Sequence, residues 1–141
     1  MIKTVIFDLD GLLVDSEFMT YEFYKGLLAE KGADFPLKTH TILSGNGIDG
    51  YFDGGVFGDE IEHSKPAPDV FLKAKEKAGT RAEECLVLED SDAGIHAAYA
   101  AGISVICIPD LKQPSEESRK MARLVLPSLL DVKEVLENKE I

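Results

Sequence analysis

Basic residues, paired cysteines and long apolar runs are scarce in this sequence, and each absence excludes a class of protein. Lysine and arginine number 15 against 26 acidic residues, so the formal net charge is −11. Because nucleic acids and anionic membranes are bound through basic patches, this balance argues against both partners. No apolar run approaches the roughly 20 residues of a membrane-spanning helix, and the amino terminus does not resemble a signal peptide. We therefore expect a cytoplasmic protein.

The two cysteines do not form a recognisable pair. Cys85 and Cys107 lie in separate apolar runs and lack the Cys-x-x-Cys spacing of redox and metal motifs. We expect two buried thiols in a reducing compartment, and nothing indicates a disulfide. The apolar and charged fractions of 45% and 29% are those of an ordinary globular protein, and 141 residues suffice for one domain with its own core.

Apolar strand-like runs alternate with helical patterns along the chain. This alternation predicts an α/β fold with a three-layer, doubly wound, parallel sheet, a Rossmann-like core. Ligands of such sheets bind at the carboxyl ends of the strands. The expected strands are 4–8, 41–44, 55–57, 85–88, 104–108 and 124–126, and the expected helices are 17–31, 68–78, 92–101, 115–123 and 128–138.

Two aspartates follow the first strand. The run 4–7 has the composition of a buried strand, and Gly11 ends it. Side chains alternate along a strand, so Asp8 and Asp10 are predicted to project to the same side. Two carboxylates there repel each other and lose water, a cost that a divalent cation, with Mg²⁺ as the candidate, or a positively charged substrate would relieve. The alternative is an ordinary strand-to-turn transition with solvated carboxylates.

Two further motifs place charged residues beside helix starts. Lys65 stands in Ser-Lys-Pro-Ala-Pro-Asp (64–69), where prolines open a helix. Glu89 and Asp90 end the apolar run of Leu-Val-Leu-Glu-Asp-Ser (86–91). The alternative interpretations are a solvated lysine and a pair of acids that cap a helix.

In this order, the three motifs resemble those of the haloacid dehalogenase superfamily, specifically its phosphatase and β-phosphoglucomutase-like branch. The resemblance covers residues 1–35 and 50–112. It implies that Asp8 attacks phosphorus and forms an aspartyl-phosphate that water later hydrolyses. Asp10 would protonate the leaving oxygen and then deprotonate the attacking water.

The resemblance also implies a ligand set. Mg²⁺ would be held by Asp8, the backbone carbonyl of Asp10, and the acids Glu89 and Asp90, with Asp90 the favoured ligand of the last two. Lys65 would lie against the transferring phosphoryl oxygens as a fixed positive charge. Phosphate would also be bound near Gly11, which allows close backbone approach, and by the hydroxyl of Ser44, unless Ser44 is merely a turn residue.

The segment before Tyr51 is much shorter than the cap-bearing segment that the resemblance implies. We interpret residues 1–141 as a single core domain in which residues 15–49 are a truncated cap remnant, reduced to about one helix. A deletion, a gene fragment and omission of residues from a longer protein all remain open as explanations. The apolar stripe of the helix 17–31 would then be uncovered and would favour a homo-oligomer.

These observations predict a Mg²⁺-dependent phosphatase that acts on a small phosphorylated metabolite. A sugar-phosphate mutase of the same family is one alternative. Another is a weakly active or inactive oligomeric module that binds metal or phosphate. A response-regulator receiver domain is disfavoured, because there the acid pair comes first and the phosphorylated aspartate lies on a later strand. The substrate itself cannot be predicted, because the segment that would select it is the shortened one.

Overall fold

A computed structural model describes residues 1–9, 12–13 and 47–138 of the chain. Several sequence predictions fall outside these residues and stay predictions. They concern Asp10, Gly11 and Ser44, the helix 17–31, the strand 41–44, and residues 15–46 of the cap remnant with the oligomer contact assigned to it.

The core of the described chain is a parallel sheet with the order β1-β2-β3-β4. The strands are β1 (Thr4–Phe7), β2 (Cys85–Glu89), β3 (Ser104–Cys107) and β4 (Leu124–Val125). Phe7 pairs with Leu88, and Glu89 pairs with Cys107. The carboxyl ends of β1, β2 and β3 therefore lie side by side at one edge of the sheet.

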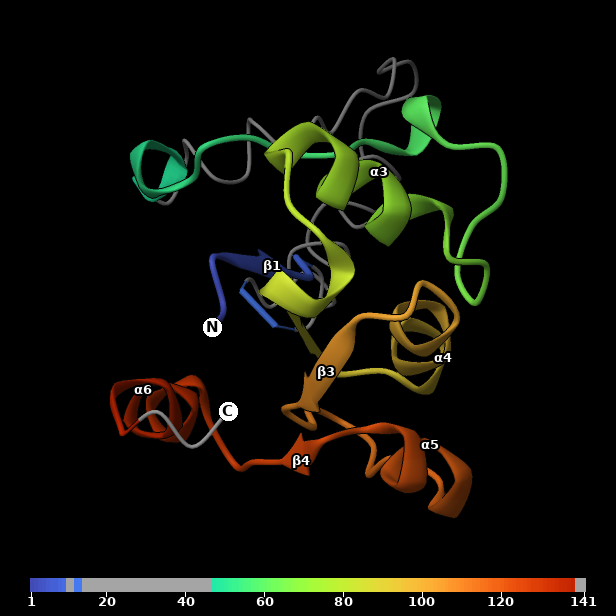
Figure 1. Ribbon diagram of the computed structural model, residues 1–141. Coiled ribbons are helices and arrows are strands. Elements are labelled where there is room, and N and C mark those ends of the chain that lie inside the picture. The colour runs from blue at the N-terminus through green and yellow to red at the C-terminus, as the bar shows by residue number, and fades with distance from the viewer. Residues whose placement is uncertain (10–11, 14–46, 139–141) are drawn as a thin grey trace, which may run out of the picture.

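Helices cover both faces of this sheet (Figure 1). They are α3 (Asp69–Ala78), α4 (Asp92–Ala100), α5 (Glu116–Met121) and α6 (Leu129–Glu137). Val87 and Val105 face the side where Phe71 of α3 and Ile95 of α4 are buried. The alternate residues of the strands, such as Leu86, Leu88 and Ile106, pack on the opposite side against Val132 of α6. The three-layer α/β architecture is confirmed.

Local sequence signals set the ends of the helices. Gly79 ends α3 in the left-handed conformation with φ 64°, which a residue without Cβ adopts at little cost. Ser91, Ser115 and Ser128 cap α4, α5 and α6, each accepting a backbone N–H of the first turn. The bounds predicted for these elements from the sequence hold to within one or two residues.

The strand predicted at residues 55–57 is wrong. This segment has no strand and leads into the 3₁₀-helix η2 (Gly58–Glu60). The backbone N–H of Phe57 donates to Glu60 Oε1 at 3.0 Å, so it serves a local turn and not a ladder. Gly54 and Gly55 supply no side chains for a pleated surface, which removes the packing that would favour a strand. Two more 3₁₀-helices, η1 (Asp49–Tyr51) and η3 (Ala82–Glu84), lie in other connections.

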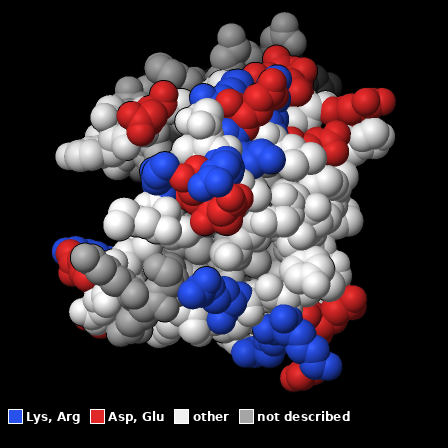
Figure 2. Space-filling model, viewed as in Figure 1, with Lys and Arg blue, Asp and Glu red and all other residues white. Residues whose placement is uncertain are grey.

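The two cysteines follow the expectation from composition. Cys85 and Cys107 are buried and free, as predicted. Acidic and basic side chains are mixed in the upper part of the view in Figure 2, where α3 lies in Figure 1. Ion pairs made by residues of α3 include Lys73–Glu76 at 3.1 Å and Lys77–Glu60 at 2.6 Å. Among the described residues, no helix has the length and apolar character needed to cross a bilayer.

Candidate active site

A lysine links the ends of two neighbouring strands. Asp8 directly follows β1, and its backbone N–H donates to the carbonyl of Leu88 at 3.0 Å, which keeps it in register with β2. Lys65 Nζ donates to Asp8 Oδ1 at 2.6 Å and also to Glu89 Oε1. The structure therefore brings together three residues that the sequence places 57 and 24 positions apart.

Glu89 is the fully buried member of this group, with 0% of its surface exposed. Its Oε2 accepts three hydrogen bonds, from the backbone N–H of Asp90 at 3.0 Å and from the N–H and hydroxyl of Ser91, both at 2.9 Å. A buried carboxylate is tolerated only when it is paired and hydrogen-bonded, and both conditions are met here. Glu89 is thus a fixed anchor for Lys65.

Lys65 is held from a second side by an aromatic ring. Its Nζ lies 5.1 Å from the ring centroid of Phe71, a residue of α3 that is buried in the core. Burial works to lower the pKa of Lys65, but the charges of Glu89 and Asp8 and their hydrogen bonds outweigh it, so the pKa is raised. The side chain therefore carries a fixed positive charge at neutral pH.

Asp90 completes an acidic group. One carboxylate oxygen from each of Asp8, Glu89 and Asp90 lies within 4.8 Å of the others, a spacing that could hold a metal ion. Burial, followed by the charges of Glu89 and Asp8, raises the pKa of Asp90 to about 6. A single lysine does not neutralise these three acids, and a hard divalent cation suits their oxygen ligands.

The raised pKa of Asp90 predicts a pH-dependent stability of the metal-free protein. Asp90 releases its proton near its ordinary pKa of 3.8 when unfolded and near pH 6 when folded. The stability that this proton contributes is thus present below pH 3.8 and lost as the pH rises through 6. The thermal midpoint of Asp90→Asn in chelator should rise relative to wild type across this range. A constant difference between the two midpoints would contradict the raised pKa.

Two other polar side chains near these motifs lie outside the acidic group. Asp92 accepts the backbone N–H of Ser115 at 3.0 Å and so joins the starts of α4 and α5. His63 is exposed and pairs with Asp69 at 3.2 Å. Phe71 and Ser91 were missed from the sequence, since an apolar helix residue and a helix cap carry no signal of contact with a charged group.

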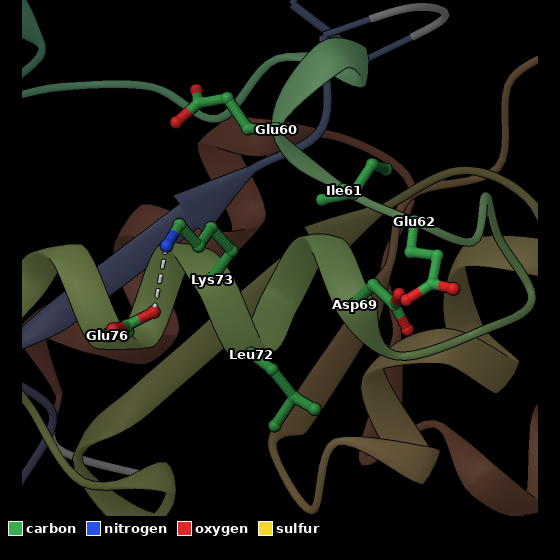
Figure 3. Close-up of a pocket in the computed structure, with 7 residues that line it drawn as sticks. All are labelled: Glu60, Ile61, Glu62, Asp69, Leu72, Lys73 and Glu76. Atoms are coloured by element: carbon green, nitrogen blue, oxygen red, sulfur yellow. Dashed lines mark hydrogen bonds and ion pairs between the residues drawn. The ribbon is translucent and has the colours of Figure 1, made fainter.

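The surface also has a shallow recess beside α3, which Figure 3 shows in close-up. It encloses about 270 Å³. None of the predicted site residues lines it, and its four acids would repel a phosphorylated ligand. The lining residues are Glu60, Ile61, Glu62, Asp69, Leu72, Lys73 and Glu76. We therefore place the candidate active site at the strand ends and not in this recess.

Two curated proteins are similar to part of this chain. Fructose-1-phosphate phosphatase YqaB of Escherichia coli is 43% identical over 66 residues, which are 47% of this chain and 35% of that protein. The phosphorylated carbohydrates phosphatase of Thermotoga maritima is 41% identical over 59 residues, which are 42% of this chain and 27% of that protein. The chain thus matches about a third or less of each relative's length.

Solved structures and a family profile extend the comparison. A HAD family hydrolase from Deinococcus radiodurans, crystallised with bound phosphate and sodium, superimposes with a TM-score of 0.58 and 25% identity. The superposition covers 70% of this chain and 46% of that one. The profile of the haloacid dehalogenase-like hydrolases matches residues 36–108, just over half of the chain. Together with the three motifs and the parallel sheet, this match shows that the chain belongs to the haloacid dehalogenase-like hydrolases.

Proposed function

We propose that the chain carries the catalytic core of a Mg²⁺-dependent phosphatase that hydrolyses a small phosphorylated metabolite through an aspartyl-phosphate. The observation that carries this proposal is Lys65, which bridges Asp8 and the buried Glu89 beside Asp90. Two relatives that match part of this chain are named phosphatases of phosphorylated sugars or carbohydrates, and a structural neighbour holds phosphate.

Asp8 is the proposed nucleophile. Its side chain is 21% exposed, so a substrate can reach it, while Glu89 is completely covered. A carboxylate attacks a phosphate ester only if the repulsion between the two anions is screened. Lys65 lies within hydrogen-bond distance of Asp8 and can contact the oxygens of the phosphoryl group that Asp8 receives. Asp10 is proposed to move the proton, as the family resemblance implies.

Asp8 and Asp90 are the proposed side-chain ligands for Mg²⁺, beside the backbone carbonyl of Asp10. Both carboxylates are partly exposed, whereas each oxygen of Glu89 already accepts a hydrogen bond from Lys65 or from the Asp90–Ser91 segment. Glu89 contributes its negative charge to the group and holds Lys65. When bound, Mg²⁺ would supply the additional positive charge that brings two anions together.

Hydrolysis of p-nitrophenyl phosphate tests this function. Turnover is expected with Mg²⁺ and is expected to disappear with chelator and in Asp90→Asn. Mg²⁺ at a hundredfold excess over its dissociation constant should also stabilise the wild type by roughly 2.7 kcal/mol, and the thermal midpoint of Asp90→Asn should respond much less.

Asp59→Asn is the matched control, because it removes the same charge from an exposed residue of η2. It should keep both turnover and the response to Mg²⁺. Equal turnover with Mg²⁺ and with chelator would overturn the metal dependence. A thermal response to Mg²⁺ without any turnover would instead favour the metal-binding module.

A further inference from the structure

A glycine in the first turn of α4 lies directly over the carboxylate of Glu89. Ser91 caps this helix, and Gly94 is its third residue. A Cβ added at Gly94 would lie 1.9 Å from Glu89 Cδ and Oε1 and 2.3 Å from Oε2. Real Cβ atoms essentially never approach other atoms this closely, so a methyl group at Gly94 and the present position of Glu89 exclude each other.

Moving the Glu89 side chain from its present position would cost free energy. Its surface is fully buried, Oε1 accepts from Lys65, and Oε2 accepts from Asp90 and Ser91. The N–H of Gly94 itself donates to Ser91 Oγ at 3.1 Å, and that hydroxyl donates to Glu89 Oε2. A shift of the carboxylate would therefore break the contact with Lys65 and leave buried polar groups without partners.

We propose that Gly94 is a positioning residue, whose missing side chain creates the space in which Glu89 holds Lys65 against Asp8. No backbone strain is involved, because Gly94 has ordinary helical geometry. Glycine within a helix is otherwise unfavourable relative to alanine. The unfavourable helix propensity of Gly94 is offset because its missing side chain allows Glu89 to hold Lys65. A loss of turnover in Gly94→Ala rests on the function proposed above, whereas a loss of stability does not.

The test is a double-mutant cycle measured by thermal unfolding. Gly94→Ala should lower the midpoint in the wild type, against the direction of helix propensity. In the Glu89→Ala background, which vacates the space, the same change should leave the midpoint unchanged or raise it. Equal lowering in both backgrounds, or no lowering in the wild type, would overturn the proposal. Gly58→Ala is the control, because a methyl group there meets nothing within 4 Å.

Further measurements apply if a variant does not fold, and they test whether Gly94 affects the contact between Glu89 and Lys65. If Gly94→Ala does not fold, its recovery by Glu89→Ala supports the proposal, and failure of the pair while Glu89→Ala folds overturns it. Glu89→Asp, one methylene shorter, replaces Glu89→Ala if that variant does not fold. In folded Gly94→Ala, the NMR chemical shifts of the Lys65 side chain should move away from their wild-type values, because its contact with Glu89 is lost. Unchanged Lys65 chemical shifts would mean that Glu89 has not moved, and would also overturn the proposal.

Discussion

Replacing Lys65 by methionine is expected to destabilise the protein by about 3 kcal/mol and to abolish detectable phosphate-ester turnover. Among the described residues, Lys65 is the cation that contacts the fully buried Glu89, and its removal leaves that carboxylate without a partner of opposite charge in this part of the chain. Removing one partner of a buried ion pair typically costs 3–5 kcal/mol, of which we take the lower bound because Lys65 remains 24% exposed. Methionine keeps an apolar contact with the ring of Phe71, so the loss reports the charge.

Urea unfolding of Lys65→Met, compared with that of Lys73→Met as a control, measures this loss of stability. Lys73 pairs at 3.1 Å with Glu76, whose side chain is 71% exposed, and such surface pairs contribute about 1 kcal/mol or less. The double variant Lys65→Met/Glu89→Gln should recover most of the lost stability, because it removes the unpaired charge, yet it should stay inactive. Equal losses of stability in the two single variants would show that Lys65 is an ordinary surface lysine.

The fold was predictable because its signals are local. Composition and periodicity located β2, and helix-start and helix-stop residues such as Pro68 and Gly79 located α3. The strand predicted at residues 55–57 was wrong because local signals there were weak. Its apolar residues were too few to decide between a strand and a turn, and a side chain from outside the segment, Glu60, decided it.

The candidate site was only partly predictable. Asp8, Glu89 and Asp90 could be predicted as site residues from their positions at strand ends, because a parallel sheet brings the ends of its strands together. The sequence analysis favoured Asp90 over Glu89 as a ligand but could not give the physical difference between them, which is burial. Glu89 is fully buried, and Asp90 is partly exposed. Gly94 carried no signal at all, since its importance lies in a contact that a side chain would prevent.

This division of roles makes the group asymmetric. A buried acid contacts the lysine, the lysine contacts Asp8, and Asp8 and Asp90 are partly exposed. If the chain acts on a phosphate ester as proposed, these fixed charges would need little reorganisation when the ester binds, which is the condition for strong electrostatic catalysis. Variants that keep the Lys65–Glu89 pair should therefore keep the fold even when they lose activity.

Asp8→Asn is the variant that separates activity from folding most clearly. We expect turnover of p-nitrophenyl phosphate to fall on the order of a thousandfold or more, because an amide is a poor nucleophile. The fold should hold, since the backbone N–H of residue 8 still bonds to the Leu88 carbonyl and Lys65 keeps its contact with Glu89. The thermal midpoint in chelator should stay the same or rise, because one of three mutually repelling carboxylates is gone.

A titration supplies the independent check on this variant. Burial and the charge of Glu89 contribute most to the raised pKa of Asp90, and the charge of Asp8 adds to them. In Asp8→Asn the pKa of Asp90, followed by NMR of its carboxyl group, should fall below about 6 but stay above its ordinary value of 3.8. Asp59→Asn should leave both turnover and this pKa unchanged. Wild-type turnover in Asp8→Asn would remove Asp8 as the nucleophile, and an unchanged pKa would show that its carboxylate does not act on Asp90.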